Sequence, residues 1–156
     1  MNKYLIISSE FPPGPGGIGQ HAASLVLASS KLGQVDVLCY QDYAEAEQIN
    51  TYNSQLPKNI TIHHFPRRSK SPFTYIKRFT EAKSHVQKIK PSHIIVSGLF
   101  TLWIGAYLKK HYSYPIQAFI HGSEVAQSKG LKAKLTHWSY QQLDQVFPVN
   151  TQLLCK

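Results

Sequence analysis

The sequence is poor in cysteine and in acidic residues, and it has no long hydrophobic run. Two cysteines occur among its 156 residues, so neither a disulfide framework nor a paired-cysteine zinc site is expected. The longest apolar stretch, residues 94–108, is interrupted by serine, threonine and glycine, and it falls short of the about 20 residues that a spanning helix needs. No signal-peptide pattern precedes the first predicted strand, which favours a cytoplasmic location.

The shortage of acidic residues leaves a strong positive charge. Lysine and arginine number 17 against 8 aspartates and glutamates, giving a formal net charge of +9, which attracts phosphates, nucleic acid or an anionic membrane surface. A solvated helix face at 67–90 is favoured over peripheral contact with the inner face of a membrane. Phe73 and Phe79 fall on the apolar face of that helix, which argues against nucleic acid. The basic residues concerned are Arg67, Arg68, Lys70, Lys77, Arg78, Lys83, Lys88 and Lys90.

Short apolar runs alternate with helix-like segments along the chain. Such alternation predicts an α/β domain, a Rossmann-like doubly wound parallel sheet of about six strands with helices on both faces. Ligands of such sheets bind outside the carboxyl ends of the strands. A helix with Ser71 as its N-cap and Pro72 as its first residue is expected to end before Pro91. Its buried face is expected to consist of Phe73, Ile76, Phe79, Ala82, Val86 and Ile89. We predict strands at 4–8, 35–40, 60–65, 93–97, 115–120 and 145–149, and helices at 18–32, 44–49, 72–90, 99–112 and 132–143.

The loop at 10–21 between the first strand and the first helix is rich in glycine. Glycines let a ligand approach the backbone, and the start of a helix attracts phosphate. Gly14, Gly16 and Gly19 satisfy the dinucleotide pattern G-x-G-x-x-G, with Asp42 as the candidate acid for the ribose. In that pattern the first glycine turns directly off the strand, whereas a longer proline-containing segment intervenes here. An NAD(P)-dependent oxidoreductase therefore stands as the alternative reading of this loop.

A histidine ends the fifth predicted strand and is followed by a glycine and a carboxylate. His121 would face the same ligand site as the glycine loop, where it can donate a hydrogen bond to a sugar hydroxyl or stabilise developing charge. Glu124 either faces that site or caps the next segment. His63 and His64 are adjacent in a strand and so face opposite sides, and no histidine spacing resembles a set of metal ligands. We expect no metal.

Three segments together resemble the family 4 retaining glycosyltransferases of the GT-B fold. They are Leu5-Ile6-Ile7-Ser8-Ser9-Glu10-Phe11-Pro12-Pro13, Gly16-Gly17-Ile18-Gly19-Gln20-His21 and His121-Gly122-Ser123-Glu124-Val125. The resemblance implies two Rossmann-like domains, of which residues 1–156 are the N-terminal, acceptor-side one. The C-terminal domain would bind the nucleotide sugar and carry a pair of glutamates that this sequence lacks. Because Asn150 and Thr151 resemble the cap of a new helix and the sequence ends at Lys156, we expect a truncated domain that transfers no sugar alone.

The resemblance also implies roles for the residues of the two loops. His121 and Glu124 would act in catalysis, and no metal or cofactor would be needed beyond the nucleotide-sugar co-substrate. The acceptor would be a glycan, a lipid-linked compound or a small molecule, as in the synthesis of cell-envelope polysaccharide. A non-catalytic basic binding module is the other alternative. The residues expected to bind substrate are Gly16, Gly17, Gly19, His21 and Glu10.

Overall fold

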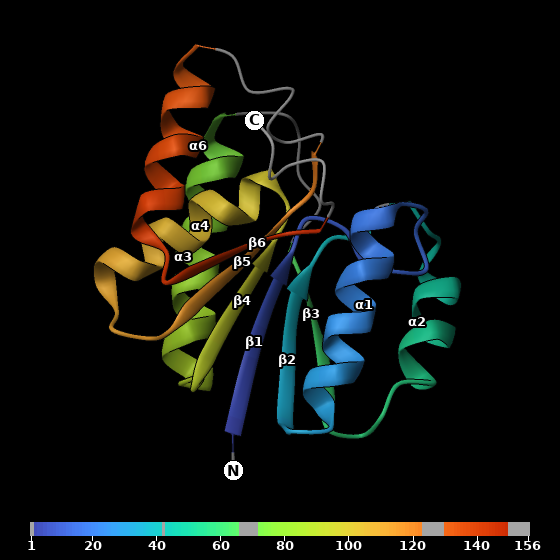
Figure 1. The fold of residues 1–156 in the computed structure, drawn as a ribbon. Coiled ribbons are helices and arrows are strands. Elements are labelled where there is room, and N and C mark those ends of the chain that lie inside the picture. The colour runs from blue at the N-terminus through green and yellow to red at the C-terminus, as the bar shows by residue number, and fades with distance from the viewer. Residues whose placement is uncertain (1, 42, 66–71, 123–129, 150–156) are drawn as a thin grey trace.

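The computed structural model describes residues 2–41, 43–65, 72–122 and 130–149, which form one parallel sheet covered by helices (Figure 1). The strands are β1 (Asn2–Ser8), β2 (Gly33–Cys39), β3 (Ile60–His64), β4 (His93–Ser97), β5 (Ile116–Ile120) and β6 (Gln145–Pro148). The helices are α1 (Gly17–Ser30), α2 (Ala46–Ser54), α3 (Pro72–Ile89), α4 (Leu99–His111) and α6 (Leu131–Gln142). The predicted fold class is confirmed.

The order of the strands places a topological switch in the middle of the sheet. The order is β3-β2-β1-β4-β5-β6, and each neighbouring pair is parallel. The chain moves outward from β1 through β2 to β3, then returns to the other side of β1 and continues through β4, β5 and β6. Crevices at such a switch are the usual ligand sites of open α/β sheets. The carboxyl ends of β1 and β4 are therefore the first place to look for a site.

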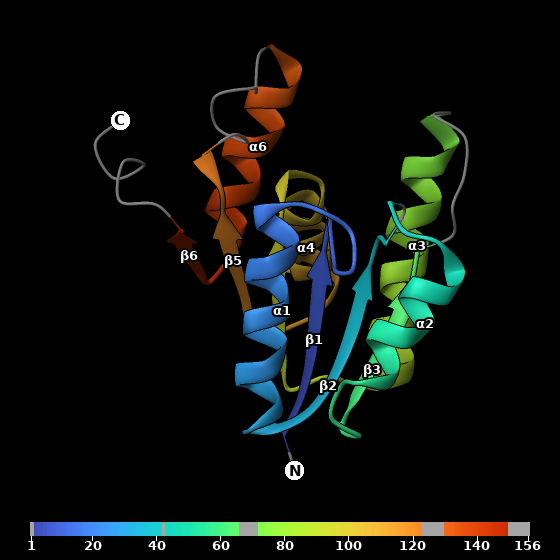
Figure 2. The same cartoon turned by 90° about the vertical axis from the view of Figure 1, so that its right-hand side faces the viewer.

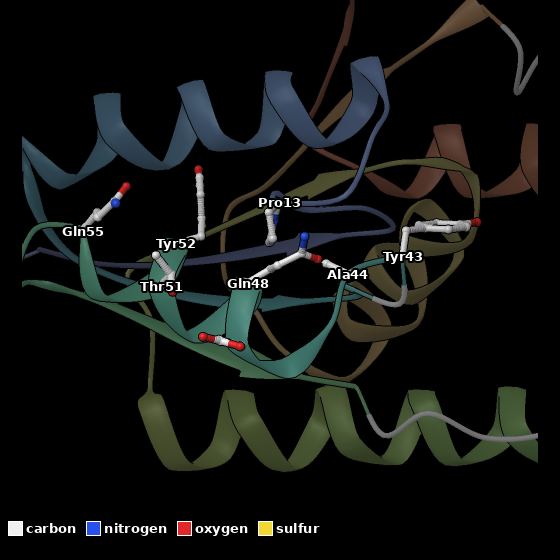
Figure 3. Close-up of a pocket in the computed structure, with 8 residues that line it drawn as sticks. Pro13, Tyr43, Ala44, Gln48, Thr51, Tyr52 and Gln55 are labelled. Carbon is white, nitrogen blue, oxygen red and sulfur yellow. The ribbon is translucent and has the colours of Figure 1, made fainter.

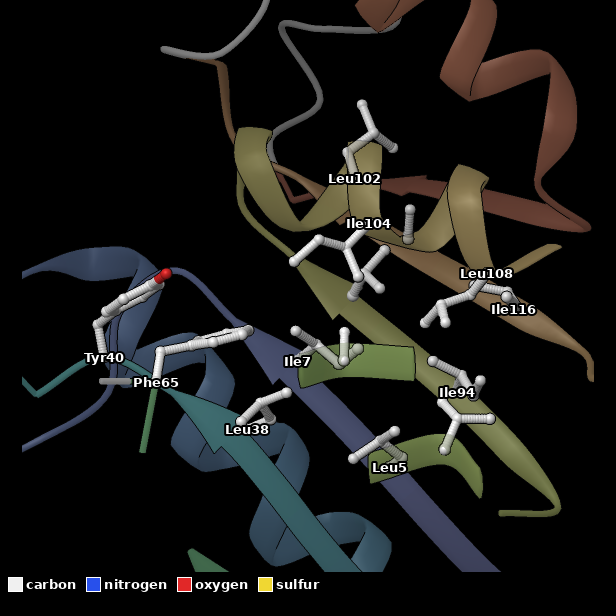
Figure 4. Packing of buried hydrophobic residues seen from close by; sticks show 14 residues of the cluster. Leu5, Ile7, Leu38, Tyr40, Phe65, Ile94, Leu102, Ile104, Leu108 and Ile116 are labelled. Atoms are coloured by element: carbon white, nitrogen blue, oxygen red, sulfur yellow. The ribbon is translucent and has the colours of Figure 1, made fainter. Parts of the chain in front are cut away.

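The two faces of the sheet follow from the alternation of side chains along β1. Ile6 packs against one face with Ala22 and Val26 of α1. Leu5 and Ile7 point to the opposite face, where they meet residues of α3 and α4, as Figure 4 shows for the strand and α4 side chains. In Figure 2, α1 and α2 lie on one side of the sheet, with α3 and α4 on the other. The central strands β1, β2 and β4 are buried on both faces along most of their length. This burial explains the continuous apolar runs in the sequence.

One expectation about α3 is wrong. Ile76 is 63% exposed instead of buried, whereas Thr74 is buried and Arg78 is half-buried. The side of α3 that faces the protein runs at four-residue spacing through 74, 78, 82 and 86. The apolar residues in the first turns of α3 therefore predict the wrong buried side for that part of the helix. The Phe73 side chain, the N-terminal cap expected at Ser71 and the helix expected from 150 lie outside what the structure describes.

The sheet and helices account for the apolar sequence between residues 94 and 108. It forms β4 and most of α4, with Leu102, Ile104 and Leu108 fully or almost fully buried against the sheet. None of the described helices has both the length and the apolar character needed to cross a membrane.

Candidate functional site

The carboxyl ends of β1 and β4 are joined by close backbone contact. The amide of Ser9 donates a hydrogen bond to the carbonyl oxygen of Ser97 at 3.0 Å, which extends the pairing of the two strands by one residue. Gly98 follows with φ of 109° and is the N-cap of α4. A Cβ at Gly98 would collide with the Ser9 hydroxyl. Only glycine therefore fits this junction without strain.

Gly16, Gly17 and Gly19 of the glycine loop differ in how much space surrounds the position of an added Cβ. Gly16 is the N-cap of α1 with φ of 134°, and the Glu10 carboxylate lies where its Cβ would be. Gly17 has open space around the corresponding position. Gly19 lies against the backbone of Phe11, at 3.4 Å from the position of an added Cβ. The open backbone that a ligand could approach is therefore at Gly17, and Glu10 braces the loop beside the helix start.

The rest of the loop is held by protein contacts that leave little resemblance to a dinucleotide turn. An added Cβ at Gly14 would lie 3.4 Å from the Cβ of Tyr43. The Pro12 carbonyl oxygen accepts a hydrogen bond from the buried Gln41 side chain. The first glycine of a dinucleotide site makes the tight turn off the strand, whereas here the turn is a proline-containing segment held by Gln41 and Tyr43. Asp42, the candidate acid for the ribose, lies outside the described residues.

Two of the predicted site histidines meet at the carboxyl edge of the sheet. The ring of His21, in the first turns of α1, lies 5.2 Å from the ring of His121 and 5.2 Å from that of Phe119. A hydrogen bond of 3.1 Å joins His121 Nε2 to Ser97 Oγ at the end of β4. The structure therefore brings His121 together with both the glycine-loop helix and the β1–β4 junction. We call His21 and His121 the carboxyl-edge pair.

Burial keeps the carboxyl-edge pair neutral near pH 7. It lowers the pKa of His21 below its usual value. The pKa of His121 is lowered first by burial and then by repulsion from a charged His21. His21 Nδ1 is buried and has no hydrogen-bond partner among the residues that the structure describes. A neutral imidazole offers one donor and one acceptor, which suits it to binding a hydroxyl group.

A cavity of about 560 Å³ opens on the outer side of the glycine loop. It lies between the loop and α2, and its lining includes Pro13, Tyr43 and Tyr52 (Figure 3). The other lining side chains come from one side of α2 and its ends and are mostly polar; they include Glu47, Gln48, Thr51 and Gln55. A mixed lining of aromatic and polar side chains is suited to a polyhydroxylated ligand.

Sequence reasoning missed a buried carboxylate. Asp36 of β2 is 6% exposed, and one of its oxygens lies 2.9 Å from Nε2 of His63 on β3. The His63 ring contacts that of His85 on α3, with centroids 4.9 Å apart. The available signal was an aspartate within an apolar strand, which needs a buried partner. Within the described ranges, no three His, Cys, Asp or Glu residues are grouped as metal ligands.

The fold has counterparts among solved structures, although the sequence matches no protein-family model and no curated protein. Sucrose-phosphate synthase from Thermosynechococcus elongatus aligns with a TM-score of 0.70 at 16% identity, covering 94% of this chain and 42% of that one. MurG from Acinetobacter baumannii aligns with a TM-score of 0.65 at 14% identity, covering 96% of this chain and 42% of that one. Both are GT-B glycosyltransferases.

A different enzyme shows that the sheet alone does not choose the chemistry. dTDP-glucose 4,6-dehydratase from Bacillus anthracis, in complex with NAD, aligns with a TM-score of 0.58 at 11% identity. The alignment covers 95% of this chain and 54% of the dehydratase chain. The present chain thus matches one GT-B domain in fold, and it spans about 42% of the length of the two glycosyltransferases.

Proposed function

We propose that this chain is the N-terminal, acceptor-side domain of a family 4 retaining glycosyltransferase. The full enzyme would move a sugar from a nucleotide-sugar donor to a glycan, a lipid-linked compound or a small molecule. The observation that carries the proposal is the position of His121, which ends β5 beside the start of α1 in a fold that matches one GT-B domain. A cytoplasmic location and a role in cell-envelope polysaccharide synthesis belong to the same proposal.

Each site residue has a role in this proposal. His121, neutral and joined to Ser97, donates a hydrogen bond to the transferred sugar. The open backbone at Gly17, with the positive end of the α1 dipole, faces the diphosphate of the donor. Glu10 and Gly19 hold the loop, and His21 limits the charge on His121. Glu124 acts with His121 in the proposed mechanism, although it lies outside the described residues.

The proposed reaction needs no metal and no cofactor. The acceptor hydroxyl oxygen attacks the anomeric carbon on the same face from which the donor phosphate departs, so the new bond forms where the bond to the phosphate breaks. The departing phosphate takes the hydroxyl proton and leaves as part of a nucleoside diphosphate. The anomeric configuration is retained because attack and departure share one face. The second domain would supply the donor site, so residues 1–156 alone are expected to transfer no sugar.

The NAD(P)-dependent alternative has less support from the site. Gly14 packs against Tyr43, and the Glu10 carboxylate occupies the space beside Gly16, so two of the three glycines of the dinucleotide pattern are covered by side chains of the protein. A non-catalytic basic module is also less well supported, because it gives no reason for the neutral histidine pair.

The test is a transfer assay on the product of the gene read past Lys156. UDP-, GDP- and ADP-sugars are offered with mixed acceptors, and released nucleoside diphosphate and the anomeric configuration of the product are measured. In the presence of EDTA, which removes divalent metal ions, we expect release of a nucleoside diphosphate and a product with retained anomeric configuration. Inverted product would exclude family 4. Binding of NAD(H) without consumption of any nucleotide sugar would favour the oxidoreductase.

A further inference from the structure

Arg78 does not lie on a solvated face as the basic pattern of α3 suggests. Its guanidinium carbon sits 4.5 Å from the ring centre of Tyr40, 5.3 Å from that of Tyr75 and 5.2 Å from that of Phe100. These rings come from the end of β2, from α3 and from α4. Tyr75 and Phe100 also contact each other, with centroids 5.3 Å apart. Aromatic faces attract a guanidinium and hold its plane in a fixed orientation.

The aromatic rings around Arg78 leave one buried N–H donor of its guanidinium, at Nε, without a partner among the described residues. The carboxylates of Asp36 and Asp144 are paired with His63 and Lys109 instead. A guanidinium carries five N–H donors and stays charged, and burying such donors unpaired is unfavourable. An incoming anion would satisfy them.

The cavity at Arg78 is linked to His121 through the β1–β4 junction. Arg78 lines a cavity of about 210 Å³ together with Ser9, Tyr40, Tyr43 and Phe100. Ser9 is also the residue whose amide is bonded to Ser97, and Ser97 Oγ is bonded to His121. The β1–β4 junction thus separates the arginine cavity from the carboxyl-edge pair. Tyr43 lines both this cavity and the larger one beside α2, so a ligand that enters one is close to the other.

We infer that Arg78 binds an anionic group, a phosphate or a carboxylate, of the acceptor. This inference rests on the proposed function and narrows its acceptor to an anionic polyol or sugar. The guanidinium donates two parallel hydrogen bonds to the anion, and the hydroxyl groups of Ser9 and Tyr43 line the remaining wall. The acceptor's hydroxyl groups then extend across the β1–β4 junction toward His121.

The test compares Arg78→Gln with Lys77→Gln in the full-length product of the gene. Both variants remove one positive charge from α3, but Lys77 is exposed to solvent. Glucose 6-phosphate, glucuronate and neutral glucose are titrated while the amide NMR signals of Ser9 and Phe100 are followed. For the two anions we expect Arg78→Gln to raise Kd at least tenfold, about 1.4 kcal/mol. We expect less than a twofold change for Lys77→Gln.

Four results would overturn the inference. The first is equal losses in both variants, and the second is glucose binding as tightly as its phosphate. The third is a UDP-induced shift at Ser9 that disappears in Arg78→Gln, because the anion would then belong to the donor. The fourth result comes from the wild-type protein and so does not depend on a variant that folds. The inference is overturned if neither anion shifts the amide signals of Ser9 and Phe100.

The outcome is separable from that of the proposed function. Hydrolysis of a nucleotide sugar by water needs no acceptor anion, so it is measured without acceptor in the wild type and in Lys77→Gln. Anion binding that depends on Arg78, with no nucleotide sugar consumed by any variant, supports the site and refutes the transferase. Nucleotide-sugar hydrolysis without anion binding supports the transferase and refutes the site.

Discussion

Histidines occur in two clusters on the same sheet, and their surroundings differ in one respect. His63 on β3 is paired with the carboxylate of Asp36, a residue that is 6% exposed. His121 at the end of β5 is bonded to a serine hydroxyl and faces another histidine. The hydrogen bond to His63 satisfies a carboxylate that would otherwise be buried without a partner, whereas His21 disfavours charge on His121. The comparison separates a structural role for His63 from a functional role for His121.

The largest expected effect comes from breaking the Asp36–His63 pair. His63→Ala leaves the carboxylate of Asp36 buried without its partner, which should lower the unfolding free energy by about 3 kcal/mol. Transfer by the folded fraction should not change, because the pair does not contact the proposed site. Urea denaturation followed by circular dichroism measures the first quantity, and a transfer assay at low temperature measures the second.

His137→Ala is the control for this experiment, because His137 is an exposed histidine of α6. We expect its unfolding free energy to stay within about 0.5 kcal/mol of wild type, as for most surface substitutions. A structural role for His63 would be contradicted if His63→Ala kept full stability and lost transfer activity.

Replacement of His121 is expected to have the opposite profile. His121→Ala removes the proposed hydrogen bond to the transferred sugar, which should lower kcat about 100-fold, roughly 2.7 kcal/mol. The unfolding free energy should change by less than about 1.5 kcal/mol, since one neutral hydrogen bond to Ser97 is lost. Steady-state kinetics and denaturation of the same preparation give both numbers.

His111→Ala is the control for His121, because His111 is an exposed histidine at the end of α4 and should keep wild-type kcat. If His121→Ala lost stability in place of activity, both histidine clusters would be structural. The comparison would then no longer point to a site at the end of β5.

The sequence predicts the fold better than it predicts side-chain partners. Every strand and helix was expected near its observed place, because apolar periodicity and glycine positions depend on neighbouring residues. The cage around Arg78 joins residues of β2, α3 and α4, which no local pattern relates. The Asp36–His63 bond depends on the register of β2 and β3, and that register is set by the whole sheet. His121 could be singled out because a strand end at the carboxyl edge carries its own functional expectation.

The smallest expected effect concerns the influence of His21 on His121. Burial and a charged His21 both lower the pKa of His121, so His21→Asn should raise the pKa of His121 while leaving it below the usual value.

A histidine with a lowered folded-state pKa binds its proton more readily when unfolded, so the unfolding free energy falls as pH drops below about 6.5. His21→Asn removes one such histidine and should make that fall shallower. NMR titration of the imidazole signals and denaturation between pH 7 and 5 measure the two changes. An unchanged pKa of His121 in His21→Asn would mean that burial alone keeps it neutral, and His21 would then have no electrostatic part in the site.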